Sequence, residues 1–173
     1  MAASRDQLLP AEGVYEIDQA ASTVRFDTRA IFGLLPVRGT FAIGQGRITV
    51  TNPADASSVH VVIEAGSFES GNQQRDDHVK SSDYLDVSRH PEIGFRSRCV
   101  ERAAAAVATL HGELTVCGMT RPTAVTLGTV AHEGKRMTAS GTTTIDRYAF
   151  GITKAKGMTG RHLRITLEVV AYC

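Results

Sequence analysis

The sequence has no tryptophan and only three cysteines, Cys99, Cys117 and Cys173, among its 173 residues. The cysteines form no Cys-x-x-Cys pair, and their odd number does not suit a disulfide framework. The six histidines show no His-x-His, His-x-x-x-His or His-Glu-x-x-His spacing. These absences disfavour a disulfide scaffold and predict no metal site.

Neither sign of charge dominates the chain. The 19 lysines and arginines stand against 18 aspartates and glutamates, a formal net charge of +1, and the two signs are interspersed. Such a chain has no field strong enough to attract nucleic acid or an anionic membrane surface from a distance. We therefore expect no nucleic-acid partner.

Long hydrophobic runs are also missing. No stretch approaches the roughly 18 apolar residues that a membrane-spanning helix needs, so no membrane span is predicted. The first residues lack a basic segment followed by an apolar run, and on this basis we expect no signal peptide and a cytoplasmic location. No Gly-x-Gly-x-x-Gly loop precedes a helix and no Gly-x-Ser-x-Gly elbow is present, so nucleotide and hydrolase sites are not indicated.

The dominant positive signal is alternation of apolar and polar residues with a period of two. In 22–32, for example, Val24 and Phe26 share one face while Arg25 and Asp27 share the other. The same pattern recurs in 37–43, 58–65, 93–96, 110–116 and 162–169. It is typical of strands with one buried face.

Turn signals such as Gly44-Gln45-Gly46 and His132-Glu133-Gly134-Lys135 separate these runs at hairpin spacing. Long consecutive strands with one apolar face favour a closed antiparallel barrel, because closure removes exposed edges. A two-sheet sandwich is the alternative, which alternation alone does not exclude. We expect a flexible N-terminal tail at 1–12 and one all-β domain at 13–173.

Residues 70–90 break the β pattern. They are polar and charged, with good helix formers around Gln73–Lys80. We predict a short helical insertion between strands, placed as a cap or lid beside the barrel mouth.

Several segments resemble, in order, the successive signatures of YceI-like domains. They are YEIDQAASTVRF, RGTFAIGQGRI, SGNQQRDDHVKSSDYLDVSRHPEIGFRS, GELTVCGMTRPTAVTL and IDRYAFGI, which together span roughly residues 14–171. The most specific are Arg75-Asp76-Asp77-His78 with Pro91, and Leu114-Thr115 through Thr120-Arg121-Pro122.

The resemblance implies an eight-stranded antiparallel, lipocalin-like barrel whose elongated apolar cavity holds a polyisoprenoid or isoprenoid quinone, for carriage or storage. It also implies homodimers, and no catalytic residue. Apart from such a bound lipid, no cofactor is expected. The chain departs from the family pattern at Ala21-Ser22, where a His-Ser pair is usual, and Tyr15 stands at an opening-strand position often held by an aromatic residue.

The inward faces of the predicted strands supply a candidate cavity wall. Its residues are Phe26, Phe41, Ile43, Val61, Ile63, Phe95, Leu114, Val125, Leu127, Ile165 and Leu167. The alternative is that the same side chains pack a dry core, because protein interiors are normally close-packed. Small residues on these faces favour a tunnel, since they leave space: Ala30, Gly39, Ala65, Ala139 and Gly141.

Polar residues of the insertion, Arg75, Asp76, Asp77 and His78, form a candidate rim, together with Arg147. The favoured interpretation is structural: charge-assisted hydrogen bonds that fix the crossover to the barrel. A second interpretation places Arg75, His78 or Arg147 against a ligand headgroup. A third makes His78 and a neighbouring carboxylate an acid–base pair of a small enzyme, and a stress-response interaction module is a further alternative.

Overall fold

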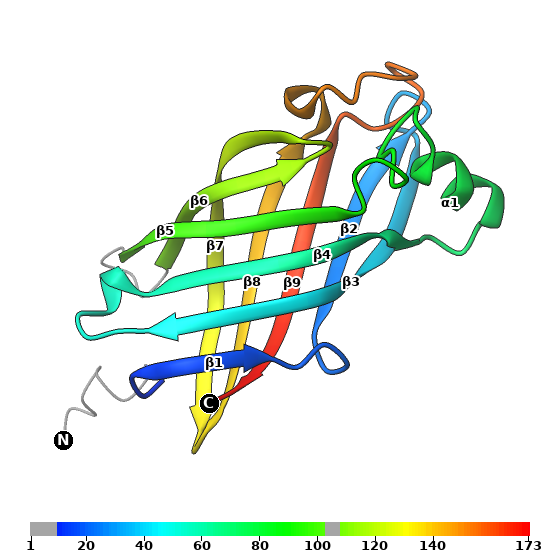
Figure 1. The fold of residues 1–173 in the computed structure, drawn as a ribbon. Helices are drawn as coiled ribbons and strands as arrows, with labels where there is room; N and C mark the ends of the chain where they lie inside the picture. Colours follow the sequence, from blue (N-terminus) through cyan, green and yellow to red (C-terminus); the bar gives the residue numbers. More distant parts are fainter. Residues whose placement is uncertain (1–9, 103–107) are drawn as a thin grey trace.

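A computed structural model describes residues 10–102 and 108–173, and Figure 1 shows that this part consists mainly of long strands. The strands are β1 (Gly13–Ile17), β2 (Thr23–Ala30), β3 (Leu35–Val50), β4 (Ser58–Glu69), β5 (Glu92–Arg102), β6 (Ala108–Val116), β7 (Met119–Glu133), β8 (Arg136–Asp146) and β9 (His162–Tyr172). The helical elements of this part are α1 (Gln73–Lys80) and the 3₁₀ turns η2 (Ala54–Ala56) and η3 (Arg147–Phe150). Residues 1–9 of the predicted tail lie outside the described residues.

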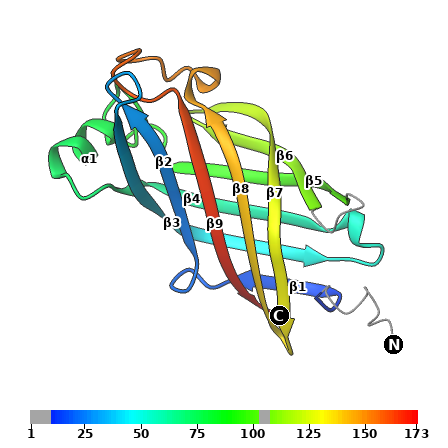
Figure 2. The same cartoon turned by 180° about the vertical axis from the view of Figure 1, so that it is seen from behind.

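Strands β2 to β9 close into an antiparallel barrel. They follow the order β3-β2-β9-β8-β7-β6-β5-β4, and β4 pairs back onto β3. Figures 1 and 2 show that β3, β4 and β5 run steeply across β7, β8 and β9. The predicted eight-stranded barrel is therefore confirmed, and the β3–β4 pairing excludes the two-sheet sandwich.

The extra strand β1 fills the space that β2 leaves between β3 and β9. It pairs with the second half of β3 and with the end of β9. At the switch from β1 to β2, the Ser22 hydroxyl accepts from the amide of Val170 (3.0 Å) and donates to its carbonyl (3.3 Å). The buried Ser22 side chain thus supplies an acceptor for the Val170 amide, and it is the serine that the chain keeps from the usual His-Ser pair, next to Ala21 in place of the histidine.

Two shifts in the β3–β4 register allow β3 to continue over its whole length. The β3–β4 register shifts between Thr40 and Ala42 and again between Ile43 and Gln45. Such bulges bend a strand and increase its twist. One strand can therefore pair with β2 in its first half and with β1 in its second half, and so wrap around the barrel.

The short helix is confirmed at Gln73–Lys80. Its N-cap is Asn72, whose side chain accepts from the amide of Arg75 at 3.0 Å and so satisfies a free donor of the first turn. Figures 1 and 2 show α1 outside the barrel wall, beyond the end of β4. No helix in the described part of the chain is long and apolar enough to cross a membrane.

Candidate ligand-binding cavity

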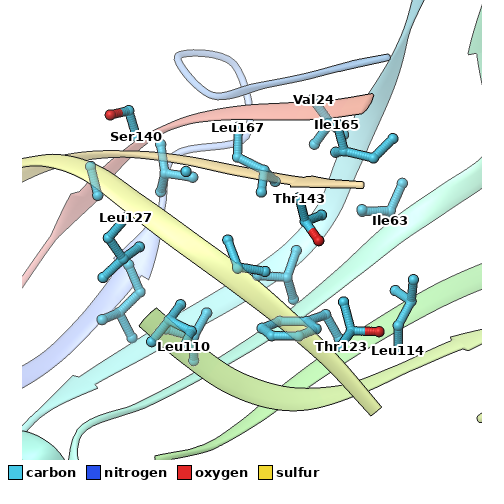
Figure 3. Close-up of a pocket in the computed structure, with 18 of the residues that line it drawn as sticks. Val24, Ile63, Leu110, Leu114, Thr123, Leu127, Ser140, Thr143, Ile165 and Leu167 are labelled. Carbon is cyan, nitrogen blue, oxygen red and sulfur yellow. The ribbon is translucent and has the colours of Figure 1, made fainter. Parts of the chain in front are cut away.

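An elongated apolar cavity of about 300 Å³ lies inside the barrel. Its lining extends from Pro10 and Ala54 at one end to Arg147 and Phe150 at the other. Figure 3 shows side chains from strands on opposite sides of the barrel converging on this space. The volume is at the lower end of the roughly 300–1,000 Å³ that small-ligand pockets occupy.

Most residues of the predicted wall line this cavity. They are Phe41, Val61, Ile63, Phe95, Leu114, Val125, Leu127, Ile165 and Leu167. They come from β3, β4, β5, β6, β7 and β9, and they meet because alternate residues of each strand point to the same side. The alternation thus places side chains far apart in sequence around one space.

Phe26 and Ile43 are buried but do not line the cavity. The Phe26 ring stacks on Phe68, with ring centroids 4.9 Å apart, and both rings contact Phe41. Because Phe41 alone of the three lines the cavity, the other two rings form a packed layer behind it. Ile43 belongs to the cluster around Tyr15 and Val24.

The structure adds lining residues that the predicted wall did not include. Several lie on the same alternating faces and could have been read from the pattern: Val24, Leu110, Met137, Leu163 and Val169. Phe150 and Ile152 come from η3 and the loop after it. No period of two marks that segment, so the alternation could not reveal them.

The predicted small residues divide into two groups. Ala139 and Gly141 line the cavity and leave space for a ligand. Gly39 does not, because the Phe26 ring occupies the space over its backbone. Ala30 and Ala65 pack in hydrophobic clusters.

Hydroxyl groups of Thr123, Ser140 and Thr143 in the wall bond to the main chain. Thr143 donates to the carbonyl of Ala124 at 2.8 Å, and Thr123 donates to that of Arg121 at 3.3 Å. Ser140 accepts from the amide of Thr129 at 2.9 Å. Among the described lining residues none is acidic, and the charged ones are Arg102 and Arg147. The interior therefore suits a hydrocarbon chain.

Arg147 is buried at the η3 end of the cavity, with 4% of its surface exposed. Its guanidinium donates to the carbonyls of Gly160 (2.8 Å), Ile152 (2.9 Å) and Thr159 (3.1 Å). It also lies 4.9 Å from the centroid of the Tyr148 ring. These bonds tie the β8–β9 connection to the barrel, which supports the structural interpretation of this residue.

Arg75 and Asp76 form a network at the start of the insertion. Asp76 is buried and accepts from the Ser70 amide (3.0 Å) and the Ser70 hydroxyl. Arg75 donates to the Ser70 hydroxyl and carbonyl, both at 2.8 Å. Neither residue lines the cavity. Both tie α1 to the end of β4, as the structural interpretation expects.

His78 pairs with Asp83, whereas the Asp76 carboxylate bonds to Ser70. Its Nε2 lies 2.8 Å from Asp83 Oδ2, and both side chains are partly exposed. The hydrogen bond from His78 lowers the pKa of the Asp83 carboxyl. Asp77 is exposed, and its Oδ1 accepts from the side-chain Nε2 of Gln73 at 3.2 Å. Within residues 10–102 and 108–173, no three His, Cys, Asp or Glu side chains are placed to hold a metal ion.

A second, more polar cleft of about 590 Å³ opens between β7 and β8. The two strands pair up to Thr126 and Thr142, and the pairing ends toward the η3 end of β8. Thr123, Thr143, Ile145 and Phe150 border both this cleft and the internal cavity. The wall between cavity and solvent is therefore one side chain thick at this point.

Residues 15–171 match the YceI-like domain family, and the chain belongs to this family. A UPF0312 protein of Pseudomonas putida strain GB-1 is 32% identical over 174 aligned residues, which cover 96% of this chain and 88% of the relative. A UPF0312 protein of Ectopseudomonas mendocina is 32% identical over 139 residues, 76% of this chain and 72% of the relative.

Solved structures share the fold. BcnA of Burkholderia cenocepacia superposes with a TM-score of 0.79 at 24% identity, over 89% of this chain and 98% of BcnA. A polyisoprenoid-binding domain of Saccharophagus degradans, implicated in plant cell wall breakdown, superposes with a TM-score of 0.71 at 14% identity, over 92% of this chain and 98% of that domain.

Proposed function

We propose that the barrel binds one long, apolar, isoprenoid-type lipid, a polyisoprenoid or an isoprenoid quinone, for carriage or storage. The observation that carries this proposal is the elongated cavity, whose described lining holds no acidic side chain and in which the hydroxyls of Thr123, Ser140 and Thr143 bond to the main chain. The polyisoprenoid-binding domain of Saccharophagus degradans has the same fold, which supports this class of ligand.

The energetics favour a chain-like ligand. Each methylene removed from water contributes about 0.8 kcal/mol, so a chain of many methylene-sized groups binds without polar contacts inside the barrel. The modest volume of about 300 Å³ favours a single chain over a two-tailed lipid. A polar end, where the lipid has one, would lie at an end of the cavity or at the β7–β8 cleft, where Thr123 and Thr143 border both spaces.

A catalytic role is not part of the proposal. Two His–carboxylate pairs have the composition of an acid–base site, His78 with Asp83 and His111 with Glu101, but none of these four residues lines the cavity. The cytoplasmic location and the homodimer remain predictions.

Displacement of a fluorescent apolar dye by prenols of increasing length, with straight-chain alkanols for comparison, tests the proposal. Ala139→Phe places a ring in the cavity, and Ala131→Phe places one on the exposed face of the neighbouring β7 as the matched control. We expect prenol affinity to fall at least tenfold in the first variant and to stay unchanged in the second. Equal binding by both variants, or no displacement by any prenol, would refute the proposal.

A further inference from the structure

The turn between β2 and β3 presents a cluster of exposed apolar side chains, here called the apolar tip. It consists of Ile31, Phe32, Leu34 and Leu35, with Met158 from the β8–β9 connection. Phe32 and Leu34 are 76% and 79% exposed. Figure 1 shows the β2–β3 turn at the end of the barrel, near the β8–β9 connection. Exposed apolar clusters of this kind mark surfaces that contact a partner.

The main chain fixes the apolar tip in place. The amide of Ile31 donates to the carbonyl of Met158, and that of Phe32 donates to Gly157, each at 2.7 Å. Ile31 and Phe32 have φ values of 50° and 54°. This left-handed conformation is uncommon for bulky side chains and persists only where the surroundings enforce it. The tip is therefore held outward by its neighbours.

Three cationic residues lie on the segments that carry the apolar tip, and the Lys156 ammonium lies 5.2 Å from the centroid of the Tyr148 ring. Arg29 donates to the carbonyl of Gly33 (3.4 Å) at its base, and Lys154 and Lys156 are exposed on the connection that carries Met158. The nearby acids are paired: Asp27 with Arg38 at 3.0 Å, and Asp83 with His78. Lys154 also acts on Asp83 electrostatically and helps to lower the pKa of that carboxyl. The local charge around the tip is positive although the chain is nearly neutral.

We propose that the apolar tip inserts into the interface of an anionic lipid bilayer, with Arg29, Lys154 and Lys156 at the level of the headgroups. Apolar side chains that enter the acyl boundary beneath a ring of cations are the combination that such surfaces bind. A stable protein partner would need about 20–30 residues a side, and the tip offers five apolar side chains. The nearly neutral net charge means that attachment depends on this local contact.

This inference goes beyond the proposed ligand, because it concerns where the barrel docks and does not depend on what fills the cavity. A docked tip would place the η3 end of the cavity near the membrane, since the β8–β9 connection contributes to both. The docking and the ligand are tested separately.

The absence of tryptophan allows a direct test of insertion. Phe32→Trp places a single indole on the tip, and Tyr172→Trp places one at an exposed site at the end of β9 as the matched control. Vesicles of phosphatidylcholine with one quarter phosphatidylglycerol should shift the emission of the first variant to the blue and leave the second unchanged. Indole emission from Phe32→Trp that does not respond to the vesicles, or equal shifts in both variants, would overturn the proposal.

Flotation of the full chain with the same vesicles measures how much the apolar side chains of the tip and the neighbouring lysines each contribute to vesicle binding. Phe32→Gln combined with Leu34→Gln should reduce the bound fraction at least tenfold, while Val14→Gln, an exposed apolar site on β1, should not. Lys154→Gln and Lys156→Gln should each weaken binding about fivefold on anionic vesicles at low salt.

Equal flotation of the wild type and the double variant that carries Phe32→Gln and Leu34→Gln, or no flotation of the wild type, would contradict docking at the tip. Loss of a wild-type dimer in the double variant, without vesicle binding, would assign the tip to self-association and also overturn the proposal.

Discussion

Phe26 and Gly39 face each other across the β2–β3 ladder, and the Phe26 ring covers the backbone of Gly39. A Cβ atom on Gly39 would collide with the Phe26 ring and would lie 2.5 Å from the carbonyl oxygen of Glu69. Glycine at this position thus allows the Phe26 ring, and with it the aromatic layer of Phe26, Phe41 and Phe68, to pack against β3. An aromatic ring that covers a glycine on the neighbouring strand is known to stabilise that glycine in a sheet.

Gly39→Ala should therefore destabilise the fold by about 1–3 kcal/mol, the usual result of overpacking a close contact. Gly66→Ala is the matched control, because a Cβ there meets nothing within 4 Å. Urea unfolding of both variants gives the comparison. If Gly39→Ala were as stable as Gly66→Ala, the packing of the aromatic layer would be different from that described.

Ser22→Ala should lower the free energy of unfolding by about 1–3 kcal/mol. The hydroxyl bonds to both main-chain groups of Val170, and its removal leaves the part-buried Val170 amide without this acceptor, while the carbonyl keeps the amide of Asp18 at 2.8 Å. Ser88→Ala, at an exposed position, should change stability by less than about 0.5 kcal/mol. Equal effects of the two substitutions in urea unfolding would show that the Ser22 contacts do not hold the β1–β2 switch.

Arg147→Met separates a structural role from a role at a ligand headgroup. Three main-chain carbonyls lose a donor, so we expect a loss of about 3 kcal/mol or more in unfolding free energy. The unfolding free energy of Arg147→Lys should lie between those of the wild type and Arg147→Met, since one ammonium cannot reproduce the planar set of guanidinium donors. A variant that unfolds like the wild type but no longer binds prenols would instead support the headgroup role. Arg136→Met, at an exposed position that lines neither the cavity nor the β7–β8 cleft, serves as control.

The ion pair between Asp146 and Arg161 should contribute to stability at neutral pH. Hydrogen bonds from Arg161 lower the pKa of Asp146 in the folded chain below the ordinary carboxyl value of about 4. A carboxyl whose pKa is lower in the folded than in the unfolded chain stabilises the fold at pH values above the unfolded pKa. This stabilisation is lost as the pH falls through the folded pKa. The difference in Tm between wild type and Asp146→Asn should therefore be largest near pH 7 and shrink below about pH 4.

The exposed Asp55→Asn substitution controls for loss of a surface carboxylate in that comparison. A Tm difference for Asp146→Asn that stays constant from pH 7 to pH 3 would rule out the ion pair as its cause.

The sequence predicted the barrel and most of the cavity wall because both follow from local alternation. A residue such as Leu167 is placed by the direction of its own strand, and the period of two gives that direction. The helix at Gln73–Lys80 was predicted on similar local grounds, from its helix formers.

Features that depend on tertiary contacts were not predictable in this way. Alternation puts Phe26 and Phe41 on inward faces, but only the stacking of Phe26 on Phe68 removes it from the cavity. Phe150 and Ile152 enter the wall through a 3₁₀ turn that Arg147 holds. His78 follows Asp76 and Asp77 in sequence, yet the turn after α1 brings Asp83 to it. In each case the position is decided by a residue distant in sequence or by a turn that no period marks.

Native mass spectrometry of the full chain as purified, with organic extraction of the same sample, tests the central claim most directly. We predict an adduct whose extracted lipid is built from isoprene units, present in wild type and Ala131→Phe and absent or strongly reduced in Ala139→Phe. Recovery of the bare chain alone, together with failure of added prenols to form a complex, would contradict a lipid-binding barrel.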